Sequence, residues 1–288
     1  MSNFAKLGML AAFLISGLAL NAQSSTDELL EKANKQYNLY AYNLAVRSYR
    51  SVLEQEPGNP EAIGKLADCY RQLNQPDEAV KWYERAVVVP GASASILLNY
   101  GKTLASLGRY DDAKKQFQRY AEGNQMIGNH FVSSCDFAKA HGDDPAAFVV
   151  KNEAINTPSS DFGAAFFNKN VIFSSSRSDM ARKADKKSAS DWTGDAYNQL
   201  FLSSRDAKGF LGKPAFLKSD LENNFNEGPV SFSADGEKVA FCRNNFVDGS
   251  RQVGGSGVRM SLYLGDLIDG KWANVKPFAW NGDFSTGY

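Results

Sequence analysis

A 34-residue repeat in the first half of the chain restricts the folds that are open to it. Ala45, Ala79 and Ala113 recur at this constant spacing, and the residues at fixed distances from each alanine are alike. An aromatic residue follows each alanine by four positions, and a small residue precedes it by twelve. These residues are Tyr49, Tyr83 and Phe117, and Ala33, Ala67 and Gly101. A fixed period of this length predicts stacked units that bury their apolar faces against their neighbours.

Each unit is predicted to be a pair of helices. Small residues on both helices let the two backbones approach, and the aromatic residue fills the space between neighbouring pairs. Turn signals at 74–76 and 107–109 separate the helices, and breakers at 57–60 and 90–91 separate the units. The segments LADCYRQLNQPDEAVKWYERAV and YGKTLASLGRYDDAKKQFQRYAE closely resemble the tetratricopeptide repeat. The resemblance covers residues 27–122 and implies three helical hairpins.

An amphipathic segment at 124–141 is expected to close the third repeat. Its apolar residues follow three- and four-residue steps, so we expect them to cover that repeat. They are Ile127, Phe131, Cys135 and Ala138. His130 and His141 fall close to one face of this helix, but no third ligand accompanies them, so no metal site is expected.

The first helices of such repeats line a concave face that binds extended peptides. The residues that place polar or aromatic groups on this face are our candidate partner-binding groove: Asn34, Tyr37, Asp68, Arg71 and Lys102. Chaperone-binding members of the family clamp a terminal carboxylate, but Leu30 stands where that clamp has a Lys, and Lys65 where it has an Asn. We therefore expect a groove for a protein segment rather than a carboxylate clamp of that kind. The alternative, a groove that packs only against its own chain, stays open.

The hydrophobic pattern changes from helical to alternating after 143–145. Short runs such as 171–173, 200–202 and 239–241 are β-branched or aromatic and are bounded by turn residues, so they predict strands. The region repeats with a unit of about 60 residues. Within it SDFGAAFFNKNVIFSSSR matches NEGPVSFSADGEKVAFCRNN, and NQLFLSSRDAKGFLGKPAFL matches MSLYLGDLIDGKWANVKPFAW. The matched pairs are Gly163 and Gly228, Phe173 and Phe241, Arg177 and Arg243, Phe201 and Tyr263, and Pro214 and Pro277.

The turn at 233–236 ends in Asp-Gly, which supplies the positive φ of a tight hairpin. These units resemble the WD-repeat-like blades of TolB-type β-propellers. The expected fold class is therefore α+β and multidomain, an α-solenoid of three repeats plus a capping helix followed by all-β propeller blades. A closed propeller takes 4 to 8 blades, whereas this region supplies about two and the start of a third, so we expect an incomplete propeller in a chain that is a fragment.

The first residues are typical of an export signal. Lys6 precedes an apolar run at 7–20, which is too short to span a bilayer, and cleavage is expected after Ala22. No cysteine lies near this site, so no lipid anchor is expected. We divide the chain into a signal peptide at 1–22, the repeats at 23–122, a capping helix and linker at 123–146, and the partial propeller at 147–288.

Three cysteines are too few and too widely spaced for a zinc or redox motif. Cys69, Cys135 and Cys242 are expected to be buried thiols, with a bridge between the first two as the alternative in an oxidising compartment.

No catalytic signature occurs in the sequence, so we predict a non-enzymatic protein without a cofactor. A nucleophile elbow, a zinc-binding helix and a phosphate loop are all missing. The glycine-rich run at 254–257 is interpreted as a hairpin tip, and the basic patch at 183–187 beside Trp192 as a solvated loop that could touch a partner. The 32 basic and 32 acidic residues balance, so nucleic acid is not an expected partner, and no span of the membrane is expected.

The order of signal, helical repeats and blades resembles the OmpA-family envelope proteins, among them the PorE-like components of the type IX secretion system. The resemblance implies a scaffold in the periplasm, associated with the outer membrane and cell wall, whose partners are other envelope proteins. Peptidoglycan would be reached only through a downstream domain that these residues do not contain. The alternative is the propeller region of a secreted serine peptidase whose catalytic domain lies beyond residue 288.

Overall fold

The computed structural model describes residues 25–89, 93–142, 150–178, 180, 189–219, 221, 226–244 and 260–282. The expected signal peptide, the breakers at 90–91, the basic patch at 183–187 and the glycine-rich run at 254–257 lie outside these residues. So does the expected start of a third blade. The chain divides into two compact units, one of Met1–Ala147 with Asp191–Gly194, and one of Phe148–Ser190 with Asp195–Tyr288.

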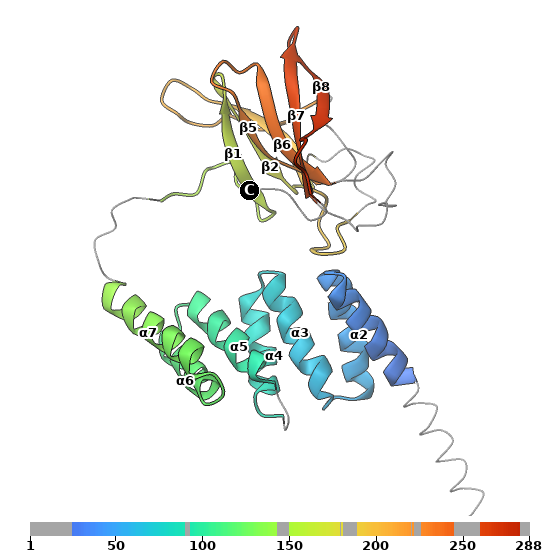
Figure 1. Ribbon diagram of the computed structural model, residues 1–288, viewed down its shortest axis with the longest axis vertical. Coiled ribbons are helices and arrows are strands. Elements are labelled where there is room, and N and C mark those ends of the chain that lie inside the picture. Colours follow the sequence, from blue (N-terminus) through green and yellow to red (C-terminus); the bar gives the residue numbers. More distant parts are fainter. Residues whose placement is uncertain are drawn as a thin grey trace, which may run out of the picture. The chain divides into compact units, whose positions relative to one another are not determined.

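The first unit is a succession of helices, drawn from blue to green in Figure 1. The helix of residues 25–38 is followed by α2 (Tyr42–Gln55), α3 (Pro60–Gln72), α4 (Pro76–Ala86), α5 (Ala94–Ser106), α6 (Tyr110–Ala121) and α7 (Gln125–His141). Pro60 and Pro76 stand in the first turn of their helices, where a missing N–H costs nothing. Three helical hairpins and a further helix therefore occupy the region where the repeat predicts them.

The turn inside each hairpin repeats as regularly as the core. Tyr40, Asn74 and Gly108 occupy equivalent positions of the three repeats, and all three have positive φ angles, of 59°, 55° and 73°. Glycine adopts this conformation at little cost, asparagine tolerates it, and tyrosine does so only under strain. The first repeat, which has no glycine at this turn, keeps the same backbone geometry with Tyr40.

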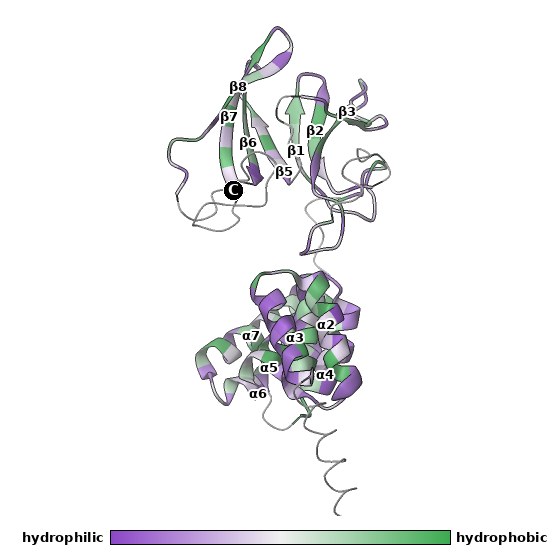
Figure 2. Ribbon diagram, turned by 90° about the vertical axis from the view of Figure 1, so that its right-hand side faces the viewer, coloured by the Kyte–Doolittle hydropathy of each residue, from purple (hydrophilic) through white to green (hydrophobic). Residues whose placement is uncertain are grey.

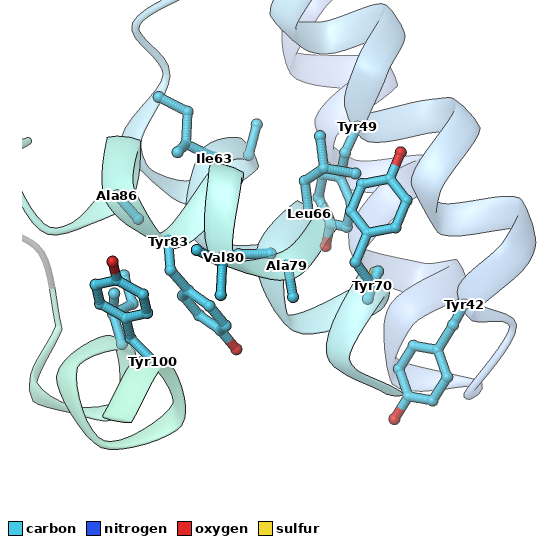
Figure 3. Packing of buried hydrophobic residues seen from close by; sticks show 14 of the residues in the cluster. Tyr42, Tyr49, Ile63, Leu66, Tyr70, Ala79, Val80, Tyr83, Ala86 and Tyr100 are labelled. Carbon is cyan, nitrogen blue, oxygen red and sulfur yellow. The ribbon is translucent and has the colours of Figure 1, made fainter. Parts of the chain in front are cut away.

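The repeated small and aromatic residues form the core of the helical unit. Ala33, Ala67, Ala45, Ala79 and Ala113 are fully buried, as are the aromatic side chains that follow the last three alanines. A Cβ placed on Gly101 would lie 2.5 Å from Cε1 of Phe117, so only glycine fits there. Figure 3 shows Tyr83 beside Tyr100, with ring centroids 5.6 Å apart. The predicted pairing of helices is confirmed.

Helix α7 packs on the third repeat and continues its register. Cys135 lies one repeat length after Gly101 and is buried, and the ring of Phe131 stacks on that of Phe117 at 4.9 Å. Ile127 is 37% exposed, so it is less covered than Cys135. Gly128 also meets the third repeat, because its backbone lies against Ala121.

The second unit consists of two four-stranded antiparallel sheets. The first contains β1 (Asp161–Phe167), β2 (Asn170–Ser175), β3 (Gln199–Ser204) and β4 (Ala215–Phe216) in that order. The second contains β5 (Glu227–Phe232), β6 (Lys238–Asn244), β7 (Met260–Ile268) and β8 (Lys271–Pro277), also in order. Green hydrophobic bands alternate with paler and purple ones along these strands in Figure 2, as expected of strands with unlike faces.

The two sheets are copies of one unit, as the sequence match predicts. Gly163 and Gly228 both have positive φ and both lie where the register of the first strand pair shifts. Phe173 pairs with Phe201, and Phe241 with Tyr263. The match of Pro214 with Pro277 is wrong, because Tyr263 pairs with Pro277 whereas Phe201 pairs with Phe216.

An aromatic cluster joins the two sheets. The ring of Phe167 in the first sheet lies 4.8 Å from that of Phe232 and 5.5 Å from that of Trp272 in the second. Ile172 and Leu200 from the first sheet share a buried cluster with Val230 and Phe241 from the second. The described strands do not close into a ring, so the β-propeller stays a prediction.

All three cysteines are free and buried. Burial, followed by the nearby Asp68 carboxylate, raises the pKa of the Cys69 thiol to about 12, so this thiol is not a nucleophile at neutral pH. Across the described ranges, no helix combines the length and the apolar character that a membrane span needs.

Candidate partner-binding groove

The first helices of the three hairpins carry the candidate groove residues at repeat-related positions. Asn34, Asp68 and Lys102 occupy equivalent positions on the helix of residues 25–38, on α3 and on α5. Tyr37 and Arg71 form a second such pair, one turn further along their helices. The repeat therefore gives the groove regular rows of side chains.

Buried tyrosines fix the first row from behind. The hydroxyl of Tyr49 on α2 donates a hydrogen bond to Oδ1 of Asn34 at 2.7 Å. The hydroxyl of Tyr83 on α4 donates in the same way to Oδ1 of Asp68 at 2.5 Å. Burial and then the Asp68 carboxylate raise the pKa of Tyr83, so its hydroxyl stays a donor at neutral pH.

Hydrogen bonds between successive first helices complete this row. Asn34 donates through Nδ2 to Oε1 of Glu61 on α3 at 3.0 Å, and Asn99 on α5 donates through Nδ2 to Oδ1 of Asp68 at 2.9 Å. Asn34 and Asp68 are thus held on both sides within the protein. Asp68 is buried as well, so its carboxylate helps to set the shape of the groove.

The third repeat breaks this pattern. Phe117 stands where the first two repeats have tyrosine, so it offers no hydroxyl to Lys102, which is exposed. The ammonium of Lys102 instead lies 4.9 Å above the ring of Phe131 on α7. Such a contact contributes about 0.5–1 kcal/mol at an exposed site and leaves the three N–H groups free to donate.

Tyr37, Asp68 and Arg71 come together in the middle of the groove. Burial, and after it the Asp68 carboxylate, raise the pKa of the Tyr37 hydroxyl. Nε of Arg71 lies 3.8 Å from Oδ1 of Asp68 and is buried with no hydrogen-bond partner among the described residues. The ammonium of Lys65 lies 3.9 Å from the centroid of the Tyr37 ring. This part of the groove therefore combines two cations with one engaged carboxylate.

Three residues that shape the groove were missed among the candidates. Lys65 and Asn99 are one repeat length apart and lie three positions before Asp68 and Lys102, so the register itself could have found them. Phe131 could not have been found in this way, because its role depends on how α7 packs against the third repeat. Asn34 contacts Glu61 and Tyr49, whereas Lys102 contacts Phe131.

The helical unit also includes Asp191–Gly194, which pack at the turn of the first repeat. The ring of Trp192 stacks on Tyr40 at 6.1 Å and meets Tyr42 edge-on at 5.5 Å. The backbone N–H of Asn43 donates to the carbonyl oxygen of Trp192 at 3.0 Å. Tyr42 in turn meets Tyr37 edge-on at 5.5 Å, so this aromatic cluster adjoins the groove.

Two family models, both described as tetratricopeptide repeat, match residues 40–87 and 94–122. The helical unit is an array of tetratricopeptide repeats. Proteins with such arrays mediate protein–protein interactions, and relatives of this array are in general non-catalytic. Within the described residues, no three His, Cys, Asp or Glu side chains gather in a way that could hold a metal ion.

A curated relative of the array is the small glutamine-rich tetratricopeptide repeat-containing protein 2 of Mycosarcoma maydis. The two are 23% identical over 114 residues, which is 38% of this chain and 32% of the relative. The chain thus spans about a third of the length of that relative.

Several solved structures resemble the array. The Sgt2 tetratricopeptide domain from Aspergillus fumigatus is 22% identical and covers 45% of this chain and 91% of its own, with a TM-score of 0.38. The Yersinia enterocolitica type III secretion chaperone SycD, in complex with a peptide of the translocator YopD, is 14% identical. It covers 40% of this chain and 95% of its own, also with a TM-score of 0.38. MamA is 20% identical and covers 42% and 67%, with a TM-score of 0.39.

Proposed function

We propose that the protein is a non-enzymatic interaction scaffold whose groove holds an extended segment of another protein. The observation that carries this proposal is the row of groove side chains that internal hydrogen bonds hold in place. Asn34 and Asp68 are fixed by tyrosines behind them and by the neighbouring first helices. A surface fixed before binding loses less side-chain entropy when a partner docks, so more of the contact energy appears as affinity.

The direct test is a pull-down from an envelope extract of the producing cell. Wild type is compared with Tyr37→Ala plus Arg71→Glu, which removes an aromatic surface and reverses a charge in the middle of the groove. The matched control is Lys81→Ala plus Lys115→Glu, because both lysines are exposed on second helices. We expect the groove variant to lose partners that the control keeps. Equal recovery of every partner by all three proteins would show that the groove is structural.

The location of this scaffold is also part of the proposal. The protein is exported to the periplasm and organises a secretion or gliding assembly at the outer membrane and cell wall. Support comes from the apolar run at 7–20 and from the resemblance of the whole arrangement to PorE-like envelope proteins. N-terminal sequencing of the protein from its own cell should begin at Gln23. Full-length chain recovered from the cytoplasm would contradict export.

The β unit would then offer a second binding surface. Its two sheets repeat one strand plan, with the same bulge and the same aromatic pair, as neighbouring blades do. We assign the two sheets to a propeller that binds one partner while the groove holds another. Because both architectures build broad surfaces, each should bind its partner without the other.

A further inference from the structure

We infer that the segment in the groove is acidic and places one carboxylate side chain at Lys65 and another at Lys102. This inference rests on the proposed function and names the chemical class of the partner. It starts from a property that the two lysines share. Within the described part of the chain, neither has a carboxylate oxygen within 4 Å, and both ammonium groups lie over aromatic rings.

The carboxylates closest to Lys65 along α3 are already engaged. Glu61 accepts the hydrogen bond from Asn34 at 3.0 Å. Asp68 accepts from Tyr83 and Asn99 through the same oxygen, and Arg71 lies 3.8 Å from that oxygen. Glu61 and Asp68 thus have other hydrogen-bond partners, and neither comes within 4 Å of the ammonium of Lys65. A carboxylate arriving with a partner can accept a hydrogen bond from that ammonium.

The acidic residue on the helix beside Lys102 is engaged too. Asp136 on α7 occupies the position one repeat length after Lys102, but both of its oxygens accept from the ammonium of Lys114 on α6, at 2.7 and 2.8 Å. The contact with Phe131 restricts where the ammonium of Lys102 can lie while leaving its donors free. A second carboxylate of the partner can therefore bind here.

The positions of the two lysines also set the geometry of the partner. They lie on α3 and α5, the first helices of neighbouring repeats. The ammonium of Lys65 lies over Tyr37 on the helix of residues 25–38, and that of Lys102 lies over Phe131 on α7, so the two are separated by more than one spacing of packed helices, which is roughly 8–10 Å. Because an extended chain advances about 3.3 Å per residue, the two acidic side chains of the partner should be more than about three residues apart. A chain terminus is not required, because Leu30 fills the position at which a terminal carboxylate would need a cation.

Selection from a phage-displayed library of random nine-residue peptides on the full chain tests this inference. We expect the peptides that depend on the groove to carry two Asp or Glu residues at that spacing. Groove dependence means that Tyr37→Ala plus Arg71→Glu abolishes binding. Replacing either acidic residue by its amide, or Lys65→Gln or Lys102→Gln in the protein, should weaken binding about fivefold each. Lys81→Gln on α4 is the matched control and should leave binding unchanged.

The outcomes separate the inference from the proposed function. Groove-dependent peptides without acidic enrichment would overturn the acidic partner and leave the scaffold standing. So would groove-dependent peptides whose binding does not change in Lys65→Gln and Lys102→Gln. If no selected peptide depends on the groove, while far-ultraviolet circular dichroism shows the groove variant folded, both the inference and the binding role of the groove are overturned.

Discussion

At the scale of single residues, one buried aromatic position in each repeat determines whether a groove side chain is held by a hydrogen bond. Tyr49, Tyr83 and Phe117 occupy equivalent buried positions, but only the tyrosines can donate a hydrogen bond to the groove. The hydroxyl fixes the residue in front of it, and its loss in the third repeat leaves Lys102 to contact Phe131. The chemistry of the groove is therefore set from the second helices as well as the first.

The two tyrosine hydroxyls should differ in their contribution to stability. Tyr83→Phe removes a hydrogen bond to a carboxylate, which contributes about 1.5–3 kcal/mol, whereas Tyr49→Phe removes one to an amide, which contributes about 0.5–1.5 kcal/mol. The measurement is the free energy of unfolding of the helical unit in urea. Tyr100→Phe is the control, because its hydroxyl makes only a long contact of 3.4 Å with Glu84. Equal losses for Tyr83→Phe and Tyr49→Phe would contradict this account.

Gly101 should tolerate no larger residue. Gly101→Leu would force the Phe117 ring out of its place, and overpacking of this kind costs about 1–3 kcal/mol. Gly58→Leu is the matched control, because nothing lies within 4 Å of the position of its Cβ. Thermal melting followed by circular dichroism should show a lower midpoint for the first variant alone. An unchanged midpoint for Gly101→Leu would count against the helix pairing.

At the scale of elements, the sequence predicts the helices and turns that recur with the repeat. It misses strands that only their pairing with a neighbouring strand defines. The helices and their turns follow from the constant spacing of Ala45 and its counterparts. The match between the two β units correctly predicts that Gly163 and Gly228 are equivalent, and the structure adds that a bulge lies at each. The two-residue strand β4 could not be predicted in this way, because only its pairing with β3 defines it. The match of Pro214 with Pro277 is wrong for the same reason, because strand pairing and not sequence spacing places Phe216 opposite Phe201.

The sheet β1–β2 contains a buried ion pair with a testable pH dependence. Oδ1 of Asp161 accepts from Ser175 and Arg177, and Oδ2 accepts from Thr157. Burial alone would raise the pKa of Asp161, but hydrogen bonds from Ser175, Arg177 and Thr157 outweigh it and hold the pKa below its usual range. A carboxylate with a lowered pKa stabilises the fold at pH values above its unfolded pKa of about 3.9. This stabilisation is lost as the pH falls through the folded pKa.

Asp161→Asn should therefore lower the stability of the β unit at pH 7, by about 3–5 kcal/mol, because it leaves Arg177 buried without its charge partner. The difference from wild type should shrink as the pH falls below about 4, where wild type loses the same charge. Asp266→Asn is the control, since its ion pair with Lys238 is exposed and should contribute little. Urea unfolding at neutral and at acidic pH measures both variants. A difference that does not depend on pH would contradict the role of the charge.

At the scale of the whole molecule, the two units have separate cores. Every buried residue of the helical cluster falls between Ala33 and Cys135, and every buried residue of the β cluster falls between Ile172 and Trp272. Besides Met1–Ala147, the helical unit includes Asp191–Gly194. The change of period after 143–145 predicts helices before it and strands after it, and the structure has both in that order. Nothing in the sequence predicts the place of Trp192, which depends on Tyr40 and Tyr42.

A fragment of residues 23–142 should therefore fold on its own. It keeps the whole helical cluster and loses Asp191–Gly194, and with them the contacts of the Trp192 ring with Tyr40 and Tyr42 and the hydrogen bond from the N–H of Asn43 to the Trp192 carbonyl. Aromatic pairs of this kind contribute about 0.5–1.5 kcal/mol each. We expect a single cooperative transition by circular dichroism, with a midpoint lower than that of the helical transition in the full chain. For a domain of this size, each kcal/mol lost corresponds to roughly 4 °C.

Trp192→Ala in the full chain provides the control for this fragment. It removes the same ring while keeping the backbone carbonyl that accepts from Asn43, so its helical transition should fall, but by no more than that of the fragment. A fragment that melts without cooperativity would show that the helical core needs residues outside 23–142. If the fragment melts cooperatively and Trp192→Ala has no effect, the ring of Trp192 contacts the first repeat without stabilising it. The array would then reach its full stability without that ring.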